Sequence, residues 1–157
     1  MKVLFLCTAN SCRSILSEAI FNHLAPSGMR AYSAGSQPSG VVNPLSLQAL
    51  QQVGIATQGL ASKANDAHRE LFPDLVISVC GNAAKHDCPA YFGQATRLHW
   101  GLDDPSEVSG DAADIAAAFT ATVAQIQRRV NTFINLPFAQ LSSEQLHSAL
   151  LDIGQVA

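Results

Sequence analysis

The chain begins with a short apolar run that passes directly into a polar loop and then into a helical pattern. Residues 3–6 are Val-Leu-Phe-Leu, residues 7–14 read CTANSCRS, and apolar residues recur at helical spacing from 14 to 24. An apolar run without polar alternation is typical of a parallel strand buried on both faces. The start of the chain therefore predicts a strand, a polar loop and a helix.

The same pattern recurs along the rest of the chain. Further strands are predicted at residues 30–36, 74–79 and 96–100, and further helices at 44–53, from 111 to about 133 and from 143 to about 153. The last helix begins with a capping-box pattern, in which Ser142 is the N-cap and Gln145 follows three residues later. Strands that alternate with helices predict one α/β domain whose parallel sheet has helices on both faces.

Composition narrows the class of protein. The chain has 157 residues and a net charge of −3, which gives no reason to expect a nucleic-acid partner. No apolar run approaches the roughly 18 residues of a membrane helix, and the first ten residues are too short for a signal peptide. We therefore expect a cytoplasmic protein whose thiols stay reduced. Its four cysteines then indicate catalysis or metal binding rather than structural disulfides.

The loop at residues 7–14 has the composition of an anion site. A polar loop between a buried strand and a helix leaves several backbone N–H groups aimed at one point, with the helix dipole behind them. The loop contains no glycine, so neither the dinucleotide nor the Walker phosphate motif is present. Instead, Arg13 follows Cys7 at a spacing that lets its guanidinium bind two oxygens of a tetrahedral oxyanion held in the loop.

Cys7 is the candidate nucleophile. The amides that bind an anion also lower the pKa of this thiol, and Ser14 can donate a hydrogen bond to the sulfur. A thiolate facing a bound oxyanion, with Arg13 to take the developing charge, suits in-line displacement at phosphorus or arsenic. The alternative is a buried, inert cysteine at a strand end, which is our interpretation of Cys12. The predicted oxyanion-binding residues are Thr8, Ala9, Asn10, Ser11, Cys12, Arg13 and Ser14.

These motifs resemble the low-molecular-weight protein tyrosine phosphatase superfamily, whose signature is Cys-x5-Arg-Ser after the first strand. The resemblance is closer to its arsenate reductase branch, because CTANSCRS, SAG at 33–35, a cysteine pair after the third strand and HWGLDDP at 99–105 occur in order. It covers about residues 1–135 of a single domain at 1–157, with a C-terminal helical extension at 136–157. It implies a phosphotyrosine phosphatase I-like fold, a three-layer α/β structure with strand order 2-1-3-4.

The resemblance also implies a thiol relay. Strands one and three are neighbours in that order, which brings Cys80 to the same sheet edge as Cys7. Cys7 attacks arsenate, Cys80 then attacks the Cys7 sulfur and releases arsenite, and Cys88 attacks Cys80 to move the disulfide outward. No tightly bound cofactor is implied; an external dithiol resets the enzyme, either thioredoxin or a glutathione and glutaredoxin system. The alternatives are an idle cysteine pair and a zinc site including His86, whose ligand spacing is unusual for zinc.

The resemblance assigns a general acid to the segment at 99–105. Asp104, which precedes Pro105, corresponds to the aspartate that protonates the leaving oxygen. Asp103 is then a turn or cap residue, and His99 and Trp100 are packing residues. The alternative for the whole segment is a simple Asp-Asp-Pro turn.

A departure from the branch concerns potassium. Well-studied thioredoxin-linked members hold the ion with an Asn, a Glu, a Ser and an Asp, and Asn10, Glu18 and Ser33 match the first three. Lys63 stands where the Asp is expected, unless the register shifts to Asp66. We expect the ammonium of Lys63 to replace the ion, pair with Glu18 and fix Asn10; the alternative is a surface lysine.

The sequence therefore favours an arsenate reductase with possible residual phosphatase activity. A second function is a tyrosine phosphatase that uses only Cys7, Arg13 and Asp104, although no aromatic residue follows Asp-Pro to hold a tyrosyl ring. A third is a non-catalytic redox or oxyanion sensor. The expected partners are arsenate or phosphate and a thioredoxin or glutaredoxin system, with no nucleic acid and no membrane, and we expect a monomer or a weak homodimer.

Overall fold

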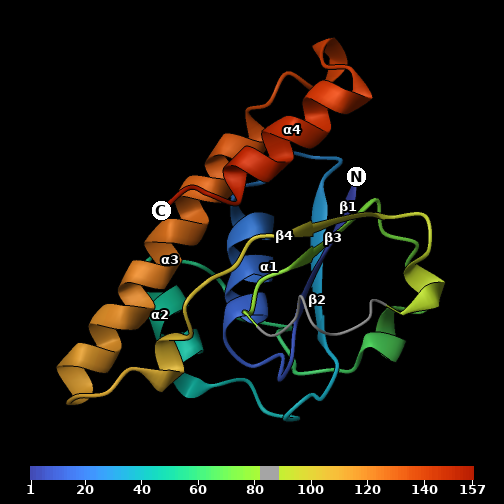
Figure 1. Cartoon of the computed structure of the whole chain (residues 1–157). Coiled ribbons are helices and arrows are strands. Elements are labelled where there is room, and N and C mark those ends of the chain that lie inside the picture. The colour runs from blue at the N-terminus through green and yellow to red at the C-terminus, as the bar shows by residue number, and fades with distance from the viewer. Residues whose placement is uncertain (82–88) are drawn as a thin grey trace.

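The computed structural model describes residues 1–81 and 89–157, so Cys88 and the rest of 82–88 lie outside the described residues. Four parallel strands form one sheet in the order β2-β1-β3-β4 (Figure 1). They are β1 (Lys2–Cys7), β2 (Arg30–Gly35), β3 (Leu75–Ser78) and β4 (Thr96–His99). The predicted strand order is confirmed, and it makes β1 and β3 neighbours.

Helices cover both faces of the sheet, as predicted, but unequally. The α-helices are α1 (Arg13–Leu24), α2 (Pro44–Gln52), α3 (Ala112–Ile134) and α4 (Ser143–Ile153). The described 3₁₀ helices are η1 (Asn65–His68), η3 (Ala90–Phe92), η4 (Pro105–Glu107) and η5 (Phe138–Gln140). All four α-helices pack on one face, whereas the shorter η1 and η3 lie on the other (Figure 1). Within the described residues, no helix combines the length and apolar character needed to cross a lipid bilayer.

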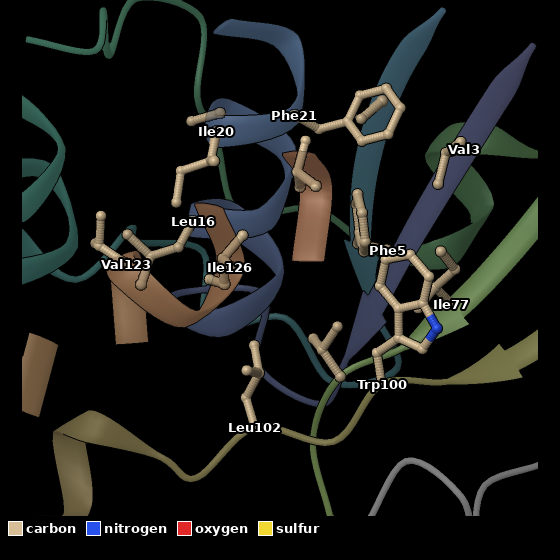
Figure 2. Packing of buried hydrophobic residues seen from close by; sticks show 14 of the residues in the cluster. Val3, Phe5, Leu16, Ile20, Phe21, Ile77, Trp100, Leu102, Val123 and Ile126 are labelled. Carbon is tan, nitrogen blue, oxygen red and sulfur yellow. The ribbon is translucent and has the colours of Figure 1, made fainter. Parts of the chain in front are cut away.

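The strands divide their side chains between two apolar clusters because successive residues of a strand point to opposite faces. Phe5 belongs to the larger cluster, where its ring lies 6.1 Å from Phe21 of α1 and 6.4 Å from Trp100 between centroids (Figure 2). Phe133 of α3 also packs in this cluster, with its ring centroid 5.5 Å from that of Phe21. Leu4 points the other way, into the smaller cluster beneath η3. The main core therefore lies between the sheet and the α-helices.

The helix α4 docks on its own sheet. It begins with the predicted capping box, in which Ser142 Oγ accepts from the N–H of Gln145 and Gln145 Oε1 accepts from the N–H of Ser142. Leu150 and Ile153 are buried in the main cluster. In addition, the indole N–H of Trp100 donates to the carbonyl of Leu150 at 2.9 Å. These contacts tie the end of the chain to the segment that follows β4.

The close approach of α4 to Trp100 requires a glycine at position 154. A Cβ atom there would lie 2.8 Å from Trp100 Cδ1 and 3.1 Å from the carbonyl oxygen of His99. We expect Gly154→Ala to lower the free energy of unfolding in urea by about 1–3 kcal/mol, because the helix must move away from the indole. The matched control is Gly81→Ala, where an added Cβ meets nothing within 4 Å. A Gly154→Ala protein as stable as the control would contradict the tight docking.

Candidate active site

The carboxyl ends of β1 and β3 bring two sulfurs together. Cys7 is the last residue of β1, and Cys80 lies two residues beyond β3, which pairs with β1 in parallel. Both thiols are buried and free of disulfide bonds, and they lie close enough for each to shift the pKa of the other. The hydroxyl of Thr8 lies 3.6 Å from the sulfur of Cys80. The predicted approach of Cys80 to Cys7 is therefore present in the reduced protein.

The two thiols shift each other's pKa in opposite directions. The hydrogen bond with Cys7 lowers the pKa of Cys80 to about 5, helped by Thr8 and by the charge of Arg13, although burial opposes the shift. The same hydrogen bond and burial raise the pKa of Cys7 well above the ordinary range of a thiol. A pair of this kind titrates as a unit and carries one negative charge at neutral pH. The lowered pKa predicted for Cys7 is found on its neighbour, because a second sulfur competes for the charge.

The backbone of the loop after β1 turns its carbonyl groups away from the site. The carbonyl oxygens of Thr8, Ala9 and Ser11 accept hydrogen bonds from the N–H groups of Gln37, Ser39 and Asn43, at 2.9, 3.0 and 3.1 Å. Within the described chain, no carbonyl accepts from the N–H groups of residues 9–12. Amides that are left unpaired on the inner side of such a loop form a concave anion site.

The close packing behind the loop depends on Gly35, the last residue of β2. A Cβ atom at this position would lie 2.5 Å from the carbonyl oxygen of Thr8 and 3.0 Å from Asn10. Any other residue would therefore push the loop away from the end of the sheet. The sequence pointed to this glycine only through the SAG motif and carried no sign of its physical role.

Asn10 holds the loop from inside. Its backbone has a φ of +49°, a left-handed conformation that asparagine tolerates, and its side chain is fully buried. The amide nitrogen donates to the hydroxyls of Ser14 at 2.8 Å and Ser33 at 3.0 Å, and the amide oxygen accepts from the N–H of Lys63 at 2.9 Å. All the polar atoms of the side chain are thus used to join the loop to β2 and to the segment before η1.

Lys63 lies beside Glu18, as the sequence predicted. Its ammonium is 3.8 Å from Glu18 Oε2, 3.5 Å from Ser33 Oγ and 2.8 Å from the carbonyl of Ala61. The hydroxyl of Ser33 in turn donates to Glu18. It is the backbone N–H of Lys63, however, and not its ammonium, that binds Asn10. Asp66 instead accepts hydrogen bonds from Arg69 and Tyr91.

Arg13 links the loop to the segment after β4. Its Nη2 is 3.0 Å from Asp104 Oδ2, and its Nη1 donates to the carbonyl of Leu102 at 3.1 Å. The Nε of Arg13 is buried, and no acceptor for it lies within the part of the chain that the structure describes. The other carboxylate oxygen of Asp104 accepts from the backbone N–H of Ser106 at 2.9 Å, so Asp104, and not Asp103, is the N-cap of η4.

Other predicted residues serve in packing and in support of the loop. Ser14 is fully buried and its hydroxyl accepts from Asn10; for this described residue no hydrogen bond to Cys7 is found, which corrects the prediction. Cys12 packs in the main cluster, as expected of an inert thiol. Trp100 packs there too, whereas His99 is exposed and binds Ser78 Oγ. Across residues 1–81 and 89–157, no three His, Cys, Asp or Glu side chains gather as a metal site.

Two contacts at this site had no signal in the sequence. The hydroxyl of Thr8 reaches Cys80 only because β1 and β3 are in register, and the carbonyl of Leu102 reaches Arg13 only because the segment after β4 turns back over the loop. Together with the paired thiols, they assemble a nucleophilic sulfur, an amide-lined loop and an arginine–aspartate pair at one sheet edge. Such a set can attack and hold a tetrahedral oxyanion.

Known proteins resemble this chain over most of its length. An arsenate reductase of Halalkalibacterium halodurans is 36% identical over 131 residues, which are 83% of this chain and 93% of that protein. A solved arsenate reductase in the phosphate-binding state superposes with a TM-score of 0.70 and 28% identity, over 90% of this chain and 98% of that chain. A thioredoxin-dependent arsenate reductase of Corynebacterium glutamicum gives a TM-score of 0.56 and 28% identity, over 83% of this chain and 61% of that chain.

The similarity extends to a whole protein family. Residues 2–147 match the low molecular weight phosphotyrosine protein phosphatases, a range that includes the cysteine loop, the arginine–aspartate pair and the first turn of α4. This match spans most of the chain and agrees with the strand order of the sheet. The protein therefore belongs to the low molecular weight phosphotyrosine protein phosphatase family.

Proposed function

We propose that this protein is an arsenate reductase that works by a relay of thiols. The observation that carries the proposal is the place of Cys80 beside Cys7 at the ends of two adjacent strands, because a hydrolytic phosphatase has no use for a second sulfur beside its nucleophile. The similarity to arsenate reductases over most of the chain supports the same reaction.

Arsenate binds in the loop after β1. The inward amides of residues 9–12 donate to its oxygens, and the buried Nε of Arg13 supplies a further donor. These donors are already oriented by the carbonyl contacts on the outer side of the loop, so little reorganisation is needed when charge develops on the oxyanion. Asn10, Glu18, Ser33 and Lys63 support the loop rather than touch the substrate.

The relay has three steps. The sulfur of Cys7 loses its proton and attacks arsenic; an S–As bond forms, an As–OH bond breaks, and Asp104 passes that proton to the hydroxyl, which leaves as water. The thiolate of Cys80 then attacks the sulfur of Cys7; an S–S bond forms, the S–As bond breaks, and its electron pair leaves with arsenic as arsenite. Cys88, which lies outside the described residues, attacks Cys80, frees Cys7 and carries the disulfide to an external dithiol. The thioredoxin-dependent neighbour favours thioredoxin for this last role.

Two other functions compete with this proposal. A tyrosine phosphatase would use Cys7, Arg13 and Asp104 and is supported by the family to which the chain belongs. A redox or oxyanion sensor would keep the same geometry and turn over nothing. The position of Cys80 favours the reductase over the phosphatase, and the similarity to arsenate reductases favours it over the sensor.

Turnover with arsenate separates these functions. With thioredoxin, thioredoxin reductase and NADPH, the wild-type protein should consume NADPH steadily, and Cys7→Ser and Cys80→Ser should each reduce the rate to background, because each removes a sulfur through which electrons pass. Cys12→Ala, which removes a thiol packed in the core, should retain the rate. Hydrolysis of p-nitrophenyl phosphate that survives Cys80→Ala, without arsenate turnover, would instead establish the phosphatase; neither activity would leave the sensor.

The shared proton predicts how the thiols titrate. In a Cys88→Ser background, ultraviolet absorbance should report one thiolate at neutral pH, since the pKa of Cys80 is about 5. Adding Cys7→Ala removes the main hydrogen bond that stabilises this thiolate, so the pKa of Cys80 should rise toward the ordinary thiol value of about 8.5. In the Cys12→Ala protein, the absorbance change that reports Cys80 should keep the same pH midpoint as in the background. An unchanged pKa in the Cys7→Ala protein would show that the two sulfurs do not share a proton.

The position of Lys63 predicts indifference to potassium. We infer that its ammonium, next to Glu18 and Ser33, supplies the positive charge that potassium supplies in other members of the branch. Arsenate reduction by the wild-type protein should therefore proceed at equal rates in potassium and sodium salts of the same ionic strength. Lys63→Met should lower the rate and make it depend on potassium. A several-fold activation of the wild type by potassium would refute this role.

A further inference from the structure

A buried arginine on α3 binds the segment that leads to the active site. Arg129 is 5% exposed, and its Nη1 donates to the carbonyls of Trp100 at 3.0 Å and Gly101 at 3.1 Å. Its Nε donates to the carbonyl of Val156 at 2.9 Å, beyond the end of α4. No carboxylate in the described chain pairs with it. Burying an unpaired guanidinium is costly, and among the described residues these three carbonyls compensate for that cost.

The segment that Arg129 holds touches both halves of the candidate site. The N–H of Leu102 donates to the carbonyl of Val79, next to Cys80, at 2.8 Å. The carbonyl of the same residue accepts from Arg13 at 3.1 Å, and Asp104 follows two residues later. Residues 100–102 thus form a short bridge between the arginine of the oxyanion loop and the strand that leads to Cys80. Figure 2 shows Trp100 and Leu102 anchored in the core from this bridge.

The bridge is fixed from one side by the sheet and from the other by Arg129 and α4. The N–H of Trp100 pairs with Ser78, and its indole pairs with Leu150 of α4. Neither of these contacts restrains the carbonyls of residues 100 and 101, which point toward α3 and bind Arg129. Loss of the guanidinium would remove that partner from both carbonyls and would release the peptide units just before Leu102.

We propose that Arg129 is a positioning residue: by holding the carbonyls of Trp100 and Gly101, it sets the place of Leu102 and Asp104 and so aims Arg13 at the bound oxyanion. The proposal rests on the proposed function for the identity of the oxyanion, although not for the coupling itself. On this proposal, the residues beyond α4 also support the active site, because the carbonyl of Val156 accepts a hydrogen bond from the same guanidinium.

The test compares two neighbouring arginines. Arg128 lies on the same helix and also binds the end of the chain, through the carbonyl of Ala157 at 2.7 Å, but it does not contact the bridge. Arg129→Met should weaken the binding of inorganic phosphate to the reduced protein by roughly tenfold or more in calorimetry, because a small displacement of a binding group has a large effect. Arg128→Met should bind phosphate like the wild type. Emission from Trp100, the only tryptophan, should change with Arg129→Met and not with Arg128→Met.

A purely structural role for Arg129 gives a different result. In that case Arg129→Met would lower the unfolding temperature and leave the phosphate affinity of the folded protein unchanged, which would overturn the proposal. If Arg129→Met does not fold, Arg129→Lys retains the charge without the planar fork, and it should still lose several-fold in phosphate affinity; wild-type affinity would again overturn the proposal. Because phosphate binding needs no turnover, the result is independent of whether the protein reduces arsenate.

Discussion

The direction of the peptide groups after β1 is the constraint on which the site depends. The carbonyls of the loop face outward and are taken up by the segment that follows β2, so the amides face inward. This orientation requires a left-handed residue at Asn10 and an absent side chain at Gly35. One short stretch of backbone is thereby kept in the conformation that binds an anion, which the isolated peptide would not adopt. The strands, the segment that follows β2 and the hydrogen bonds of Asn10 all contribute to holding it.

The second sulfur follows from the topology of the sheet. In the order β2-β1-β3-β4, the residues that follow β1 and β3 emerge side by side, and no long excursion is needed to bring Cys80 to Cys7. The proximity has an electrostatic result, since two thiols in contact cannot both be charged and one proton remains between them. In the proposed relay, the sulfur that acts second is already deprotonated while the first awaits substrate.

Much of this arrangement could be predicted from the sequence, and the limits have physical causes. Uninterrupted apolar runs and helical periodicity located the strands and α-helices, and the motifs placed Cys7, Arg13 and Asp104 together. The location of the charge on Cys80, the carbonyl of Leu102 and the role of Arg129 were not predictable, because they depend on side-chain directions and on the register of distant segments. Lys63 illustrates both cases: its pairing with Glu18 followed from the motif, whereas its backbone contact with Asn10 did not.

The inward amides have a consequence for selectivity. A ring of N–H donors and one guanidinium recognises a tetrahedral oxyanion by charge and size, and arsenate and phosphate differ little in either. In the proposed function, binding would therefore discriminate poorly between the two anions, and phosphate would compete with arsenate for the loop. In the proposed reaction, discrimination is left to redox chemistry, because arsenic can leave with the electron pair of its bond to sulfur and phosphorus cannot. Selectivity would then depend on which covalent adduct can react further with Cys80. Phosphate would bind reversibly as a competitor, and its concentration would set the apparent affinity for arsenate.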